Sequence, residues 1–140
     1  TESTPFFKNI RFKDIIGTNV EQAINIIGLA EAPPQFIVLE DIRMVCKRGL
    51  EANYVKNLTL RNIELLNVNE KSSFNITCGN QIVLDNLIGN VTSKDAPVVD
   101  VFRTDGVLLR NCVMPMLGKN KFINLKECSN VKYVGNLFCE

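Results

Sequence analysis

The stretch Leu58-Thr59-Leu60-Arg61-Asn62-Ile63 decides the fold, because its pattern recurs along the whole chain. Apolar and polar residues alternate in it, as in a strand that is half buried on one face, until an asparagine interrupts the alternation. Five further copies begin at Ile10, Ile37, Ile82, Val107 and Val131, and the last copy is one residue longer. Successive copies begin 27, 21, 24, 25 and 24 residues apart. A period of about 24 residues is typical of a repeat architecture.

An aspartate or asparagine interrupts every copy, at Asp14, Asp41, Asn62, Asn86, Asn111 and Asn136. These residue types tolerate the left-handed backbone region, so one of them can turn a strand sharply into the next strand. The apolar alternation resumes directly after each of them. We therefore expect this column to form a corner in every coil.

A second alternating strand precedes each copy from the second onward, beginning at Ile24, Leu50, Phe74, Val99 and Ile123. The segment Gly28–Pro34 follows the first of these strands and contains two prolines, which cannot donate to a strand ladder, so we expect a loop there. Three short strands per period, each with apolar residues on one face, predict an all-β fold, a single-stranded parallel β-helix. We expect residues 1–140 to form one segment of about five to six coils.

A leucine-rich repeat is the alternative architecture, because it shares the period range and an asparagine in its signature. That signature places the asparagine three residues after the central leucine, whereas here Asn62 follows Leu60 by two. No segment shows the sustained 3.6-residue apolar stripe of a helix. The pattern therefore favours the β-helix.

Composition excludes several classes of function. Sixteen basic and fifteen acidic residues leave a net charge of +1, which gives no strong attraction to nucleic acid or to an anionic membrane. No apolar run is long enough to span a bilayer, and the first residues do not resemble a signal peptide. The chain has no histidine, and its five cysteines lack zinc-site spacing, so we predict no metal and no cofactor. Cys112 and Cys139 fall on core positions, which predicts buried, unreactive thiols.

Three segments resemble the C-terminal part of bacterial proteins of glycoside hydrolase family 28. They are Thr4–Ile10, Gly28-Leu29-Ala30-Glu31-Ala32-Pro33 leading into Ile37–Ile42, and Lys47–Glu51 leading into Leu58–Ile63. The likeness covers roughly residues 4–90. It implies a right-handed β-helix from a polygalacturonase-like, inverting glycosidase that acts on pectin, a galacturonan, or a related plant polysaccharide. It also implies an extracellular or periplasmic location.

The sequence departs from that family at the catalytic motifs. It contains no Asn-Thr-Asp, Asp-Asp, Gly-His-Gly or Arg-Ile-Lys, motifs that precede the matched stretch in the family. No catalytic residue is therefore carried over. We expect the chain to be the C-terminal part of a longer hydrolase and to be inactive in isolation. The alternatives are a stand-alone carbohydrate- or protein-binding β-helix of the adhesin or fibre type, and a complete small enzyme that uses Glu51 and Asp100.

The outward residue of the second strand is polar in every coil, at Asn25, Glu51, Asn75, Asp100 and Asn124. Glu51 and Asp100 should lie two coils apart, about 9.6 Å between backbones, near the carboxylate separation of about 6.5 to 9.5 Å in inverting glycosidases. We predict that Glu51, Asn75 and Asp100 contact a sugar chain. A solvated sheet face with stacked amides would show the same alternation, so both interpretations stay open.

The first coil is expected to leave one end of the solenoid uncovered. A motif strand follows soon after residue 1, and no amphipathic helix precedes it to cover the end of the solenoid. Uncovered apolar side chains and unpaired strand edges promote association. We therefore expect end-to-end self-association of the chain.

Overall fold

The computed structural model describes residues 8–68, 71–91, 96–113 and 122–137, and this part of the chain contains nine strands and no helix. The strands are β1 (Lys8–Ile27), β2 (Gln35–Asn53), β3 (Lys56–Val68), β4 (Phe74–Thr77), β5 (Asn80–Val91), β6 (Val99–Phe102), β7 (Asp105–Arg110), β8 (Ile123–Lys126) and β9 (Ser129–Val134). No helix in the described ranges could therefore cross a membrane.

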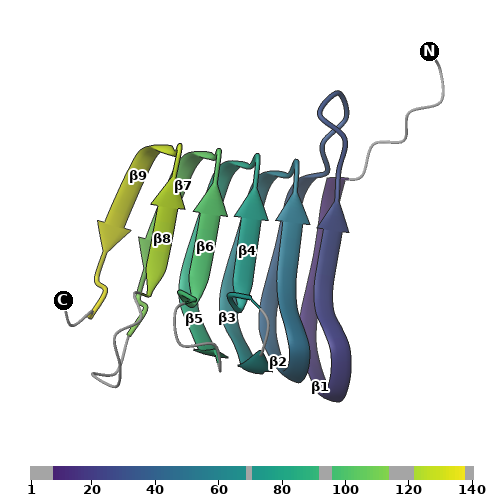
Figure 1. Ribbon diagram of the computed structural model, residues 1–140. Helices are drawn as coiled ribbons and strands as arrows, with labels where there is room; N and C mark the ends of the chain where they lie inside the picture. Colours follow the sequence, from purple (N-terminus) through teal and green to yellow (C-terminus); the bar gives the residue numbers. More distant parts are fainter. Residues whose placement is uncertain (1–7, 69–70, 92–95, 114–121, 138–140) are drawn as a thin grey trace.

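Every strand pairs in parallel with the strand at the same place in the next coil. The pairing order is β8-β6-β4-β2-β3-β5-β7-β9, and β1 lies against β2 along its length. In Figure 1 the chain rises through β4, β6 and β8, crosses behind and descends while it advances toward the C-terminus, which is a right-handed path. The predicted parallel β-helix is confirmed.

The register repeats the sequence columns. Leu58 pairs with Ile82, which pairs in turn with Val107 and then Val131. The segment between β1 and β2 leaves the solenoid as the predicted loop and holds only an antiparallel bridge between Leu29 and Ala32. Gly28 is required at its start, because a Cβ there would lie 2.3 Å from the carbonyl oxygen of Tyr54.

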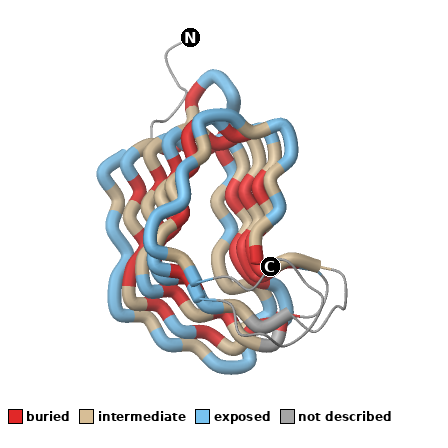
Figure 2. The backbone as a smooth tube through the Cα atoms, turned by 90° about the vertical axis from the view of Figure 1, so that its left-hand side faces the viewer, coloured by how far each residue is buried: buried red, intermediate tan, exposed pale blue. Residues whose placement is uncertain are grey.

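The core is a set of vertical files of apolar side chains inside the coils. Figure 2 shows the buried positions at corresponding places in successive coils. Ile63 and Leu87 are register partners and are 1% and 0% exposed. Cys112 continues their file, since its sulfur accepts a hydrogen bond from the Leu87 amide at 3.4 Å and its exposed fraction is 0%. The predicted stacking is confirmed here.

Four of the cysteines lie in described residues, and all four are free thiols. Cys112 is buried as predicted, whereas Cys139 lies outside the described residues. Cys46 is also buried, at 3% exposure, which the repeat pattern did not predict. Burial raises the pKa of both Cys46 and Cys112, so these thiols are poor nucleophiles near neutral pH.

The predicted corner column has the left-handed backbone conformation in five coils, at Asp14, Asp41, Asn62, Asn86 and Asn111, with φ between 52° and 58°. The side chains of this column are also linked. Asn62 Nδ2 donates to Asp41 Oδ1 at 3.1 Å, and Asn86 Nδ2 donates to Asn62 Oδ1 at 2.9 Å. The corner assignment is confirmed for these coils.

The prediction was wrong for the sixth corner. Gly135, with φ of 64°, makes the turn instead of Asn136, because the last copy has one extra residue and glycine enters this region without a side-chain clash. Asn136 still stabilises this corner, through hydrogen bonds of its side chain to the backbone. Its Oδ1 accepts a hydrogen bond from the Cys112 amide, and its Nδ2 donates to the Leu109 carbonyl, both at 2.9 Å.

A ladder of alternating charges follows the outer face of the motif strands. The column consists of Lys13, Glu40, Arg61, Asp85 and Arg110, one residue per coil. Asp85 Oδ2 lies 3.2 Å from Arg61 Nε and 3.0 Å from Arg110 Nε. Glu40 lies 3.8 Å from Arg61, and both carboxylates are less than a tenth exposed as residues. Each buried acid is thus compensated by bases in the flanking coils.

Asp85 is the most heavily bonded member of this charge ladder. Burial alone would raise its pKa, but hydrogen bonds from Asn111, Arg110 and Arg61 outweigh burial and lower the pKa of Asp85. A carboxyl with a lowered pKa in the folded state stabilises the protein above its unfolded pKa of about 3.9. That stabilisation is lost as the pH falls through the pKa that Asp85 has in the folded protein.

One hollow of about 410 Å³ opens at the β1 end of the solenoid and is lined by apolar residues that include Ile10, Ile15, Ile24 and Ile37. Phe12 is 51% exposed at this end, and β1 pairs only with β2 among the described strands. The end-to-end self-association expected from the sequence stays a prediction.

Replacing Asn62 with leucine should lower the free energy of unfolding by about 1 to 3 kcal/mol, because a branched apolar residue is strained at a φ of 52°. Urea denaturation followed by circular dichroism measures the loss. Asn62→Gly is the matched control, since glycine keeps the backbone conformation and removes only the two side-chain hydrogen bonds. Equal stability of the leucine and glycine variants would contradict the corner assignment.

Replacing Asp85 with asparagine should lower the free energy of unfolding at pH 7 by about 1 to 3 kcal/mol, because two arginines lose their buried partner. The variant should also lose less stability than the wild type when the pH falls from about 5 to about 3. Urea denaturation across this range measures both effects. Glu127→Gln, which removes an exposed pair with Arg103, should change stability little, and a wild-type pH profile for Asp85→Asn would refute the charge ladder.

Candidate functional site

The candidate site lies on the outer face of the sheet formed by the end of β2 and by β4, β6 and β8. Alternation in these strands directs one residue in two outward, and the register aligns those residues across the coils. Asn75 pairs with Glu51 on one side and with Asp100 on the other. The three predicted sugar contacts are therefore neighbours in one column, as the repeat spacing required.

These residues line a surface groove of about 540 Å³. A second column forms the other part of its floor, with Asn53, Thr77 and Phe102 in register. Segments outside the strands complete the wall through Lys71, Ser72, Ala96 and Pro97. The groove spans three successive coils, from the end of β2 through β4 to β6.

Glu51 is at one end of the column and is held by a cation. Its Oε1 lies 3.7 Å from Lys71 Nζ, and its side chain is 29% exposed. The lysine is 69% exposed, so the pair lies at the solvent boundary and contributes little to stability. Lys71 also lines the groove, so this ion pair lies at its wall.

Asn75 lies in the middle of the column and donates hydrogen bonds to backbone carbonyls beside the groove. Its Nδ2 donates to the Ser72 carbonyl at 2.8 Å and to the Leu50 carbonyl at 3.3 Å. Both bonds use the amide nitrogen, which leaves the amide oxygen to accept a hydrogen bond from a ligand hydroxyl. Asn75 therefore anchors the segment before β4 and keeps one acceptor for the groove.

Asp100 is bonded along the column to the next coil. Its Oδ1 accepts a hydrogen bond from Asn124 Nδ2 at 3.1 Å. Two strand spacings separate Asp100 from Glu51, which places their backbones about 9.6 Å apart. The two carboxylates are each held by a neighbouring donor, so they are oriented acceptors on the groove floor.

Phe102 is the groove residue that sequence reasoning missed. It follows Asp100 by two positions, so the same alternation that directs Asp100 outward also directs Phe102 outward. The Arg103 guanidinium carbon lies 5.0 Å from the ring centroid and Lys126 Nζ lies 5.9 Å from it. Two cations thus lie at cation–π distance from the ring, and Phe102 is the aromatic residue among those that line the groove.

The combination of groups indicates the ligand chemistry that suits the groove. Carboxylates, amide oxygens and the Thr77 hydroxyl hydrogen-bond to hydroxyl groups, and an aromatic ring packs against an apolar ring face. Among the described residues no group of three or more acidic, cysteine or histidine side chains could hold a metal ion. The groove therefore suits an uncharged or weakly charged polyhydroxylated chain.

Comparison with known proteins supports the architecture. No protein-family model and no curated protein matches the chain. Among solved structures it is similar to a candidate glycosyl hydrolase from Parabacteroides merdae, with a TM-score of 0.53 and 9% sequence identity. The match covers 93% of this chain and 77% of the other. At this identity the likeness shows the fold, and the chain is a β-helix of the kind found in that protein.

Proposed function

We propose that the chain is the C-terminal β-helix portion of a polygalacturonase-like glycoside hydrolase that acts on pectin or a related plant polysaccharide. In this proposal the groove of Glu51, Asn75 and Asp100 binds part of the sugar chain. Catalysis belongs to coils that precede these residues in the longer protein, which acts outside the cytoplasm.

The observation that carries this proposal is the groove itself. It combines two oriented carboxylates, an amide oxygen and an aromatic face over successive coils. A linear sugar polymer laid along the axis would meet similar groups at each coil. The fold likeness to a candidate glycosyl hydrolase and the family resemblance of residues 4–90 support the same class of protein.

A binding role fits Glu51 and Asp100 better than an acid–base role. An inverting glycosidase needs one carboxyl that keeps its proton and one that activates a water on the opposite face of the sugar. Here Glu51 is paired with Lys71, and Asp100 accepts a hydrogen bond from Asn124, so both are held as acceptors. The isolated chain should therefore bind sugar without cleaving it.

Isothermal calorimetry of the isolated chain with fully methyl-esterified oligogalacturonides, which carry no carboxylate charge for Glu51 and Asp100 to repel, tests the groove. Glu51→Ala and Asp100→Ala should each weaken binding by about 5- to 30-fold, the effect of losing about 1 to 2 kcal/mol of hydrogen bonding. Phe102→Ala should weaken binding to a similar degree through loss of the ring contact.

Glu64→Ala provides the matched control, because this carboxylate pairs with Arg43 in β2 on another face of the solenoid. It should leave the affinity unchanged. If all three groove variants bind as tightly as the wild type, the column is only a solvated sheet face and the proposal fails. Release of reducing sugar by the isolated chain would instead support the small-enzyme alternative.

A further inference from the structure

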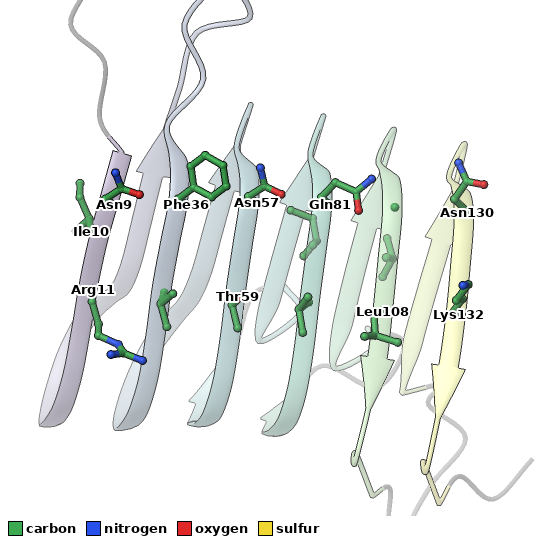
Figure 3. A pocket seen from close by; sticks show the side chains of 15 residues that line it. Asn9, Ile10, Arg11, Phe36, Asn57, Thr59, Gln81, Leu108, Asn130 and Lys132 are labelled. Carbon is green, nitrogen blue, oxygen red and sulfur yellow. The ribbon is translucent and has the colours of Figure 1, made fainter.

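A second surface hollow, of about 830 Å³, lies on a different face of the solenoid, over the first halves of β1, β2 and β3 and over β5, β7 and β9. Figure 3 shows its side chains in two rows that cross the six strands. We name this surface the basic face. None of its residues takes part in the groove described above.

The lower row in Figure 3 is one register column, whose members are Arg11, Val38, Thr59, Val83, Leu108 and Lys132. Three of its four central members, Val38, Val83 and Leu108, are apolar, although polar side chains are the usual choice on the outside of a sheet. The fourth, Thr59, adds a methyl group and a hydroxyl, and we call these four residues the apolar strip. Arg11 lies at one end of the strip and Lys132 at the other. Five strand spacings separate these two cations, about 24 Å.

Phe36 is the unusual member of the upper row. It has the left-handed backbone conformation, with φ of 55°, and it is 49% exposed. A bulky residue in this conformation is strained, and exposure of its ring brings no packing gain. Its counterparts in the adjacent coils are Asn9 and Asn57, which suit the same conformation better. Strain without burial points to a use of the ring at the surface.

The charge of this face differs from that of the whole chain. The two rows that line the hollow carry two cations, Arg11 and Lys132, and no carboxylate. The columns beside these rows add five cations, at Lys8, Lys13, Lys56, Arg61 and Arg110, and three carboxylates, at Glu40, Asp85 and Asp105. The basic face together with these neighbouring columns therefore has a net charge of +4, whereas the chain has +1.

The carboxylates beside the basic face are already engaged. Glu40 and Asp85 pair with arginines of the charge ladder, and Asp105 accepts hydrogen bonds from Ser129 and Asn130. Within the described ranges the lysines of this face and of its neighbouring columns have no ion-pair partner; they are Lys8, Lys13, Lys56 and Lys132. The uncompensated charge is thus positive and available to an anionic ligand.

We propose that the basic face is a second binding surface, which holds a linear carboxylated polysaccharide along the solenoid axis. The apolar strip and Phe36 contact the apolar faces of the sugar rings, the amides of Asn9 and Asn57 reach its hydroxyls, and the free lysines pair with its carboxylates. This inference rests on the proposed function for its ligand class, but it concerns different residues and requires charge on the sugar.

The experiment measures binding of the full chain to oligomers of polygalacturonate and to the same oligomers fully methyl-esterified, by isothermal calorimetry at low and moderate salt. Lys56→Gln/Lys132→Gln should weaken binding of the charged oligomer about tenfold and reduce its salt dependence, while binding of the ester stays unchanged. Phe36→Asn should weaken binding of the charged oligomer as well, and this variant should fold well because asparagine occupies the equivalent position in adjacent coils.

Lys47→Gln is the matched control, since this exposed lysine pairs with Glu21 and lines neither surface. This variant should not change the affinity of the basic face for the charged oligomer. Ester binding that weakens in Glu51→Ala but not in Lys56→Gln/Lys132→Gln, together with charged-oligomer binding that weakens in the lysine variant but not in Glu51→Ala, would support both surfaces. A single site that responds only to the lysine variant would support the basic face and refute the groove.

Unchanged binding of the charged oligomer by both Lys56→Gln/Lys132→Gln and Phe36→Asn would overturn this inference. Equal binding of poly-glutamate, duplex DNA or anionic vesicles, with the same loss in the lysine variant, would also overturn it. That result would show a cationic surface without selectivity for sugar.

Discussion

Every coil of this protein depends on the coil beside it, because a single coil has its apolar residues on one side only and leaves its strand edges unpaired. Parallel hydrogen bonds between coils and vertical files of side chains such as Ile63, Leu87 and Cys112 satisfy both needs at once. The corner residues make this stacking geometrically possible. The charge ladder of Glu40, Arg61 and Asp85 acts on the outside, where it stabilises the same register that the core requires.

The stacking that forms the core also creates the functional surfaces. Once the register is fixed, outward residues that are 24 or 25 residues apart become neighbours, so one polar position per repeat becomes the continuous column Glu51, Asn75 and Asp100. The same geometry on another face produces the apolar strip, with Phe36 in the row beside it and Lys132 at one end. Both surfaces run along the axis, which is the direction in which a linear polymer could contact successive coils.

The sequence was sufficient to predict the columns, because period and alternation determine which residues share a face. It predicted five corners but misplaced the sixth at Asn136, since a local insertion moved the turn to Gly135. The left-handed positions at Phe36 and Gln81 were missed because neither residue type signals such a backbone. The charge ladder was missed as well, although each of its members directly precedes a corner residue in the sequence. The distances between its side chains become visible only in the structure. The alternation of the strand could have predicted that Phe102 points outward, as Asp100 does. That Phe102 also lines the groove could be seen only from the positions of the side chains.

The central claim is that successive coils stack in the register described above. Methyl and amide nuclear Overhauser measurements on the labelled chain test it most directly. The account predicts cross-peaks between the side chains of Ile42 and Ile63 and between those of Ile63 and Leu87, together with contacts from the Leu87 amide to Cys112. Absence of these long-range contacts, with only local cross-peaks around each residue, would contradict the stacked solenoid.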